Sequence, residues 1–218
     1  MTDLTISEAY FLFALNEKGK LSGYDSAKVA CLLTAALYEL SMEGSVTFAE
    51  KRIYLSKCAP DKEFLTPLYH QLTQMDSLTF RDIYGEYASS ISGWCLNTFT
   101  SALGRLLEEK GYVTRAKVGF IGARTYYIPH KGSVPSAAAE FSIDLLYQTP
   151  PSPEDCLLWF LLEQSECIPS FFSDDQRSDI HNKVASEIRT NEKLKQLIDY
   201  ANQLLSLVRK NKLQFEYY

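Results

Sequence analysis

The chain has 218 residues, 46% of them hydrophobic, which suffices for one substantial hydrophobic core and does not require a second. We therefore expect a single domain over residues 1–218. The formal net charge of -5 excludes a protein whose whole surface binds nucleic acid, because phosphate binding needs clustered cations, but it leaves room for a local cationic patch.

The N-terminal segment lacks the basic stretch and the small-residue cleavage site of a signal peptide. No run reaches about 18 apolar residues, so no membrane-spanning helix is predicted. The five cysteines show no C-x-x-C spacing and mostly fall in apolar helical patterns, which predicts buried free thiols in a reducing compartment. They are Cys31, Cys58, Cys95, Cys156 and Cys167. Together these features predict a cytoplasmic protein whose contact with a membrane is at most peripheral.

Helical periodicity begins close to the N-terminus. Thr5 and Glu8 have the spacing of a capping box ahead of the first apolar run. A second helix is predicted to begin near Asp25 or Ser26, with apolar residues recurring at i, i+3, i+4 and i+7. Gly44 is expected to end it.

A small hairpin and three more helices are predicted next. Apolar residues alternate in SVTFAEKRIYL, as in a two-stranded hairpin. The facing residues are Val46 and Phe48 on one strand, and Ile53 and Leu55 on the other. The three helices are predicted within residues 65–75, 80–87 and 96–107.

The last helix of this group runs into a cationic ribbon, and further helices follow the ribbon. One helix is predicted to begin at Ser133 or Pro135, and the sequence SPED at residues 152–155 has the signals of a helix start. The following stretch, CLLWFLLEQSECI, is apolar nearly all round and predicts a central buried helix. Two amphipathic helices end the chain. The predicted fold class is therefore mainly α: a single compact helical domain with two β-hairpins, one projecting and hydrophobic-tipped.

The ribbon concentrates positive charge. Residues 111–139 contain no Asp or Glu, and their cations are Arg115, Lys117, Arg124 and Lys131. If residues 119–122 form the turn, Lys117 lies opposite Arg124, and Arg115, Lys117, Arg124 and Tyr126 share one face.

This arrangement favours an anion as ligand. Like charges directly opposite each other destabilise a sheet by up to about 1 kcal/mol unless something negative lies over them. An apolar tip, Phe120 and Ile121, follows the cations and suits the acyl boundary of an anionic bilayer. The alternative is that the cations point into water and the tip packs on a neighbouring subunit.

Three stretches of the chain resemble the Golgi phosphoprotein 3 family. They are LTISEAYFLFALNEKGKLSGYDSAKVACLLTAALYEL from residue 4, RLLEEKGYVTRAKVGFIGARTYYIP from residue 105 and CLLWFLLEQSECIPSFFSDDQRSDIHNKVASEI from residue 156. The resemblance implies a protein that binds phosphatidylinositol 4-phosphate on a membrane, inserts its hairpin and holds the cytosolic tails of membrane proteins.

The resemblance also implies a headgroup pocket, in which the aromatic position falls on Tyr24. The family's arginine positions fall on Leu33, Asn97 and Thr100, none of which carries a guanidinium group. The substitute cations are Lys28, Arg105, Arg115, Lys117 and Arg124, with Phe120 and Ile121 as the inserting residues. We therefore expect a bacterial relative that recognises a generic anionic lipid.

No enzyme, cofactor or metal site is predicted. The histidines His70, His130 and His181 are isolated, and no hydrolase, P-loop or dinucleotide motif occurs. The acid pairs Glu108-Glu109 and Asp174-Asp175 are expected on a surface or at a helix end. Trp94 and Trp159 lie in apolar patterns and are expected in the core.

A winged-helix module is the main alternative, although nucleic acid is not the expected partner. Residues 80–91, a turn and residues 94–110 fit a helix-turn-helix with the ribbon as wing. Asn97, Thr98, Thr100 and Ser101 would then face the bases. Against this reading, the second helix has few cations, and two adjacent glutamates would oppose phosphates. A further alternative is a helical protein-protein scaffold that forms homo-oligomers through the hairpin.

Overall fold

A computed structural model describes residues 3–21, 26–49, 52–88, 93–118, 124–168 and 172–215. Over these ranges the fold is mainly α, as predicted, with nine α-helices, one short 3-10 helix and two antiparallel hairpins. The helices are α1 (Ile6–Ala14), α2 (Ser26–Met42), η1 (Glu63–Leu65), α3 (Thr66–Thr73), α4 (Phe80–Ala88), α5 (Trp94–Glu109), α6 (Ser133–Tyr147), α7 (Pro153–Gln164), α8 (Asp174–Thr190) and α9 (Glu192–Phe215). The strands are β1 (Val46–Ala49), β2 (Arg52–Leu55), β3 (Val113–Val118) and β4 (Arg124–Pro129).

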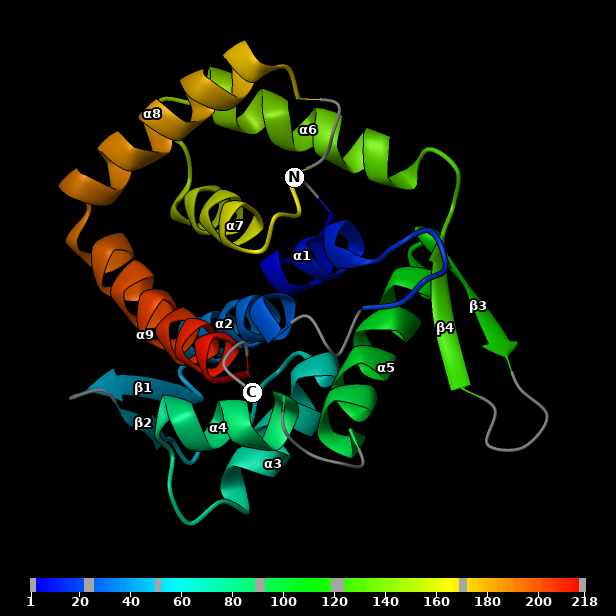
Figure 1. Ribbon diagram of the computed structural model, residues 1–218, viewed down its shortest axis with the longest axis vertical. Coiled ribbons are helices and arrows are strands. Elements are labelled where there is room, and N and C mark those ends of the chain that lie inside the picture. Colours follow the sequence, from blue (N-terminus) through cyan, green and yellow to red (C-terminus); the bar gives the residue numbers. More distant parts are fainter. Residues whose placement is uncertain are drawn as a thin grey trace.

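The helices α1, α2 and α7 occupy the middle of the molecule (Figure 1). Helices α6, α8 and α9 run around one side of them, and α5 lies on the other side with the β3–β4 hairpin projecting beyond it (Figure 1). Helix α2 contacts α1, α7 and α9, so its apolar residues are covered from several directions. The buried hydrophobic residues form one cluster to which helices from both ends of the chain contribute.

The predicted helix starts of α1 and α7 are confirmed. The Thr5 hydroxyl accepts from the Glu8 backbone N–H while the Glu8 carboxylate accepts from the Thr5 N–H, which completes the capping box. Ser152 accepts from the Asp155 N–H at 3.0 Å and precedes a proline in the first turn of α7. Helix α7 is buried along most of its length, with Trp159 fully enclosed, as its apolar sequence predicts.

The small hairpin also forms as predicted, since Val46 pairs with Leu55 and Phe48 with Ile53. Two predictions about the core are wrong. Trp94 is 62% exposed, because it begins α5 on the helix face of Thr98 and Arg105, whereas Phe99 and Leu103 occupy the buried face. Cys58 is exposed, because it lies in the loop after β2, while the other four cysteines are buried free thiols.

Candidate functional site

The β3–β4 hairpin forms, but its register differs from the predicted one. Lys117 pairs with Thr125, and Val118 pairs with Arg124. The predicted Lys117–Arg124 pair is therefore wrong, because residues 119–123 connect the strands and this connection is one residue longer than the predicted turn. Since side chains alternate along a strand, the one-residue difference moves Arg124 and Tyr126 out of the register set that contains Lys117.

The observed register places Arg115 and Lys117 on the strand face that packs against α5. Arg115 pairs with Tyr127, and Val113 and Tyr127 on this face are 1% and 5% exposed. The Tyr127 hydroxyl donates to the Ser101 carbonyl at 3.1 Å. Its ring fills the space beside Gly104, where an added Cβ would lie 2.2 Å from the nearest ring carbon. The hairpin is therefore fixed to α5 at its base.

The connection between α1 and α2 fixes the hairpin from the other side. The Tyr127 N–H donates to the Gly19 carbonyl at 3.3 Å, and the Lys20 ammonium lies 4.8 Å from the centre of the Tyr126 ring. Gly19 has a φ of +69°, and a Cβ there would lie 2.6 Å from the Tyr127 backbone. These contacts cover part of the outer edge of β4, which would otherwise be an open strand edge.

The two described cations of β3 differ in their partners. The Arg115 Nε lies 3.5 Å from a Glu108 carboxylate oxygen. The backbone N–H of Arg115 donates to the same carboxylate at 3.2 Å. Glu108 therefore pairs with the ribbon and does not simply solvate the surface. Lys117 is exposed, and among the described residues it has no ion-pair partner. Tyr24, Phe120, Ile121 and the side chain of Arg124 lie outside the described part of the structure.

Arg105 and Arg115 lie near the same tyrosine. Burial raises the pKa of Tyr127, and the positive charges of Arg105 and Arg115 oppose that rise. Lys28 lies instead in the first turn of α2, where its carbonyl accepts from the Tyr10 hydroxyl at 3.2 Å. Arg105 and Arg115 are thus both within electrostatic range of Tyr127, whereas Lys28 lies on a separate element.

The three positions that correspond to arginines in the family that this chain resembles are not cationic here. Leu33 is fully buried in α2. Asn97 is exposed on α5, and the Thr100 hydroxyl donates to the Leu96 carbonyl one turn back at 2.8 Å. These positions supply no charge to a headgroup.

A cavity of about 710 Å³ lies between α5 and the segment made of η1 and α3, beside the start of α1. Nothing in the sequence alone predicts it, because its walls come from elements far apart in the chain. One local signal is present: Trp94, Thr98, Arg105 and Glu109 share one face of α5 at helical spacing. The residues that line the cavity are Thr5, Glu8, Lys62, Glu63, Phe64, Thr66, Pro67, His70, Gln71, Tyr87, Trp94, Cys95, Thr98, Ala102, Arg105, Leu106, Glu109 and Lys110.

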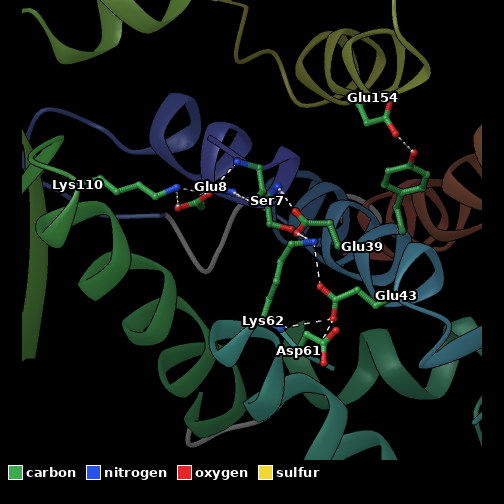
Figure 2. A network of polar contacts seen from close by, with 10 residues as sticks. Ser7, Glu8, Glu39, Glu43, Asp61, Lys62, Lys110 and Glu154 are labelled. Carbon is green, nitrogen blue, oxygen red and sulfur yellow. Dashed lines mark hydrogen bonds and ion pairs between the residues drawn. The ribbon is translucent and has the colours of Figure 1, made fainter. Parts of the chain in front are cut away.

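Three lining residues of this cavity, Glu8, Lys62 and Lys110, belong to the network of polar contacts drawn in Figure 2. The Lys110 ammonium lies 2.8 Å from a carboxylate oxygen of Glu8, whose side chain is fully buried. The Lys62 ammonium lies 2.9 Å from Glu43 and 3.4 Å from Glu39. Glu39 also accepts from the Ser7 N–H at 2.7 Å. Lys110 thus neutralises a carboxylate of α1, and Lys62 neutralises carboxylates in and just after α2 (Figure 2).

The pKa values of Glu39 and Lys62 are both raised, but for different reasons. Burial raises the pKa of Glu39, although Ser7 and Lys62 oppose the rise. The pKa of Lys62 is also raised, because its hydrogen bonds and attraction to Glu43 and Glu39 outweigh partial burial. The lysine charge is therefore favoured in the folded protein, whereas the Glu39 charge is partly opposed.

The histidines take separate structural roles. His130 contacts the Gly111 carbonyl at 2.8 Å and the Thr114 hydroxyl, and His181 lies 2.8 Å from the Glu163 carboxylate. No group of three potential metal ligands occurs within the described residues. In the same part of the chain, no helix combines the length and apolarity needed to span a bilayer.

The family profile of Golgi phosphoprotein 3 (GPP34) matches residues 6–202, nearly the whole chain. The matched range includes α1, the β3–β4 hairpin and the first part of α9. The chain belongs to the Golgi phosphoprotein 3 family. No curated protein matches it.

Proposed function

We propose that this protein is a peripheral membrane adaptor that binds anionic phospholipid headgroups at the cytosolic face of a membrane through its β3–β4 hairpin. The observation that carries the proposal is the combination of family membership with a projecting hairpin whose sequence has cations and no acids (Figure 1). An acidic protein that approaches an anionic surface has to present such a region first.

The base of the hairpin supports this role because it is held at both sides. Tyr127 packs beside Gly104 on one side, and Gly19 receives the Tyr127 N–H on the other. A fixed base lets the strands transmit binding at the tip to the helical body. Lys117 and Arg124 then attract anionic headgroups, at roughly 1 kcal/mol for each nearby cation. Phe120 and Ile121 enter the acyl boundary as the proposed wedge.

The lipid is proposed to be a generic anionic one. Bidentate arginine contacts give phosphate recognition its geometric specificity, and Leu33, Asn97 and Thr100 cannot make them. Tyr24, Lys28 and Arg105 are proposed to lie next to the headgroup and to contribute charge and stacking. Cytosolic tails of membrane proteins, and further copies of this chain through the hairpin, are proposed partners once the protein is on the membrane.

Co-sedimentation with vesicles tests the proposal. Wild type should pellet with phosphatidylcholine vesicles that contain phosphatidylserine or phosphatidylinositol 4-phosphate, to similar extents, and not with phosphatidylcholine alone. Lys117→Glu with Arg124→Glu should weaken binding by about tenfold or more, because two attractive charges become repulsive. Phe120→Ser with Ile121→Ser should weaken binding to both anionic compositions.

Matched controls are available elsewhere on the molecule. Lys57→Glu with Lys195→Glu makes the same charge change at two exposed positions outside the hairpin. Ile143→Ser with Tyr147→Ser removes exposed apolar side chains from α6, where they are 55% and 77% exposed. Both control variants should bind vesicles as wild type does. Unchanged binding by both hairpin variants would discard the hairpin mechanism.

The winged-helix alternative is weakened by the structure of α5. The hydroxyls of Thr98 and Thr100 donate to carbonyls one turn back, at 2.8 Å each. These groups are therefore engaged within the protein. Salt-dependent retention on duplex DNA without binding to anionic vesicles would restore that alternative, and binding to neither would favour the protein-protein scaffold.

A further inference from the structure

The cavity beside α5 forms a second potential site, on a different face of that helix from the one under the hairpin. Gly104 packs against the Tyr127 ring, whereas Thr98 and Ala102 line the cavity. Since successive residues of a helix are about 100° apart, Gly104 projects from α5 at a large angle to both Thr98 and Ala102. A ligand in the cavity would thus not compete for space with the strands.

The walls of the cavity are largely apolar. Phe64, Tyr87 and Ala102 are each less than 10% exposed, and Leu106 is partly buried beside them. At one end the indole of Trp94 is 62% exposed, which is unusual for so large an apolar surface in a folded protein. A cavity of this volume that combines apolar walls with polar and charged side chains has the ordinary character of a small-molecule site.

The polar groups of the cavity favour a ligand with one negative charge. Lys62 and Lys110 are already paired with Glu39, Glu43 and Glu8. Arg105 is exposed, and among the described residues it has no ion-pair partner. A guanidinium group at the rim can accept an anionic oxygen with charge-assisted hydrogen bonds. Glu63 and Glu109, which are exposed at the same cavity, would repel a multiply charged headgroup.

The charged and aromatic ends of the cavity are well separated. Arg105 follows Trp94 by eleven positions of one helix, which corresponds to about 16 Å along its axis. A compact anion could not touch both ends, whereas a linear chain could. We propose that the cavity binds a single-headed anionic amphiphile such as a fatty acid, with its carboxylate at Arg105 and its alkyl chain running along α5 towards Trp94.

A fluorescence titration with dodecanoate tests this proposal. Trp94 is exposed and Trp159 is fully buried, so a change in the emission of the exposed tryptophan reports filling of the cavity. Dodecanoate should shift the emission to shorter wavelength in wild type, and acetate, which has the charge without the chain, should not. Trp94→Phe should lose most of the signal while calorimetry still detects binding.

Two variants separate the head from the chain. Arg105→Met should weaken dodecanoate binding by about ten- to a hundredfold, as expected for a lost charge-assisted contact, and should leave dodecanol binding unchanged. Ala102→Phe fills the cavity and should abolish binding of both ligands. Thr98→Phe, at a less buried position on the same wall, provides the same test if Ala102→Phe does not fold by circular dichroism.

The proposal would be overturned if wild type did not bind dodecanoate, or if both filling variants still bound it. Equal effects of Arg105→Met on dodecanoate and dodecanol would overturn the assigned head position. Vesicle binding by the two filling variants separates this proposal from the proposed function. Filling the cavity should leave vesicle binding unchanged, and the hairpin variants should still bind dodecanoate.

Discussion

The β3–β4 hairpin and the cavity beside α5 use charge in opposite ways. In the hairpin, Arg115 meets Glu108 at 3.5 Å with both side chains at least one-third exposed, and Lys117 is left to the solvent. At the cavity, Lys110 meets a fully buried Glu8 at 2.8 Å. Solvated charges cost little free energy to rearrange, so they can serve binding. A buried carboxylate, in contrast, destabilises the fold unless it is paired.

The largest expected effect comes from breaking the buried pair. Lys110→Met should destabilise the protein by about 3 kcal/mol, because the Glu8 carboxylate would remain buried without a counter-charge. Urea denaturation at neutral pH measures this loss. Glu8→Gln with Lys110→Met should recover part of the stability, and a double variant less stable than Lys110→Met alone would show that the pairing does not matter.

The next effect concerns the attachment of the hairpin. Gly104→Ala should cost about 2 to 3 kcal/mol, because a Cβ would lie 2.2 Å from the Tyr127 ring and the ring has to move. Gly85→Ala is the matched control on α4, where a Cβ meets nothing within 4 Å, and it should be neutral or slightly stabilising. The comparison fails if the two alanine variants have the same midpoint in thermal unfolding.

A smaller, pH-dependent effect is expected at Glu39. Burial raises the pKa of Glu39 in the folded state, so the folded protein holds the proton more tightly than the unfolded chain does. The stability of wild type relative to Glu39→Gln should therefore fall as pH rises above the ordinary glutamate pKa of about 4.3, and become constant above the raised value. Urea denaturation of both proteins between pH 4.5 and 8 checks this sign, and a relative stability that increases with pH would contradict it.

The smallest effect is expected for the exposed pair of the hairpin. Arg115→Met should change stability by less than about 1 kcal/mol, because both partners are solvated in either state. Thermal unfolding measured beside Lys110→Met gives the contrast directly. A cost for Arg115→Met as large as that for Lys110→Met would mean that the hairpin pair holds the fold together.

Local patterns were enough to predict most helices and both hairpins. The capping box at Thr5, the helix start at Ser152 and the turn after α2 at Gly44 depend on residues within a few positions of each other, and such signals act wherever the segment lies. The resemblance to the Golgi phosphoprotein 3 family was likewise visible in short stretches and is confirmed by the match over residues 6–202.

Two predictions failed because they depended on the exact length of a connection or on how neighbouring residues pack. The register of the ribbon changed with one residue in its connection, and this change separated Arg124 from Lys117. Trp94 was expected in the core because its neighbours are apolar, yet it is 62% exposed, because it lies on the face of α5 that carries Thr98 and Arg105.

The sequence by itself determined the mainly helical fold, the helix boundaries and the acid-free hairpin, because periodicity, caps and composition are local properties of the chain. Only the tertiary structure decided that Lys62 and Lys110 neutralise glutamates of α1 and α2, and that α5 and α3 leave a cavity with Arg105 at its rim. The physical reason is that burial and ion pairing depend on which distant segments meet, and that meeting is set by packing of the whole core.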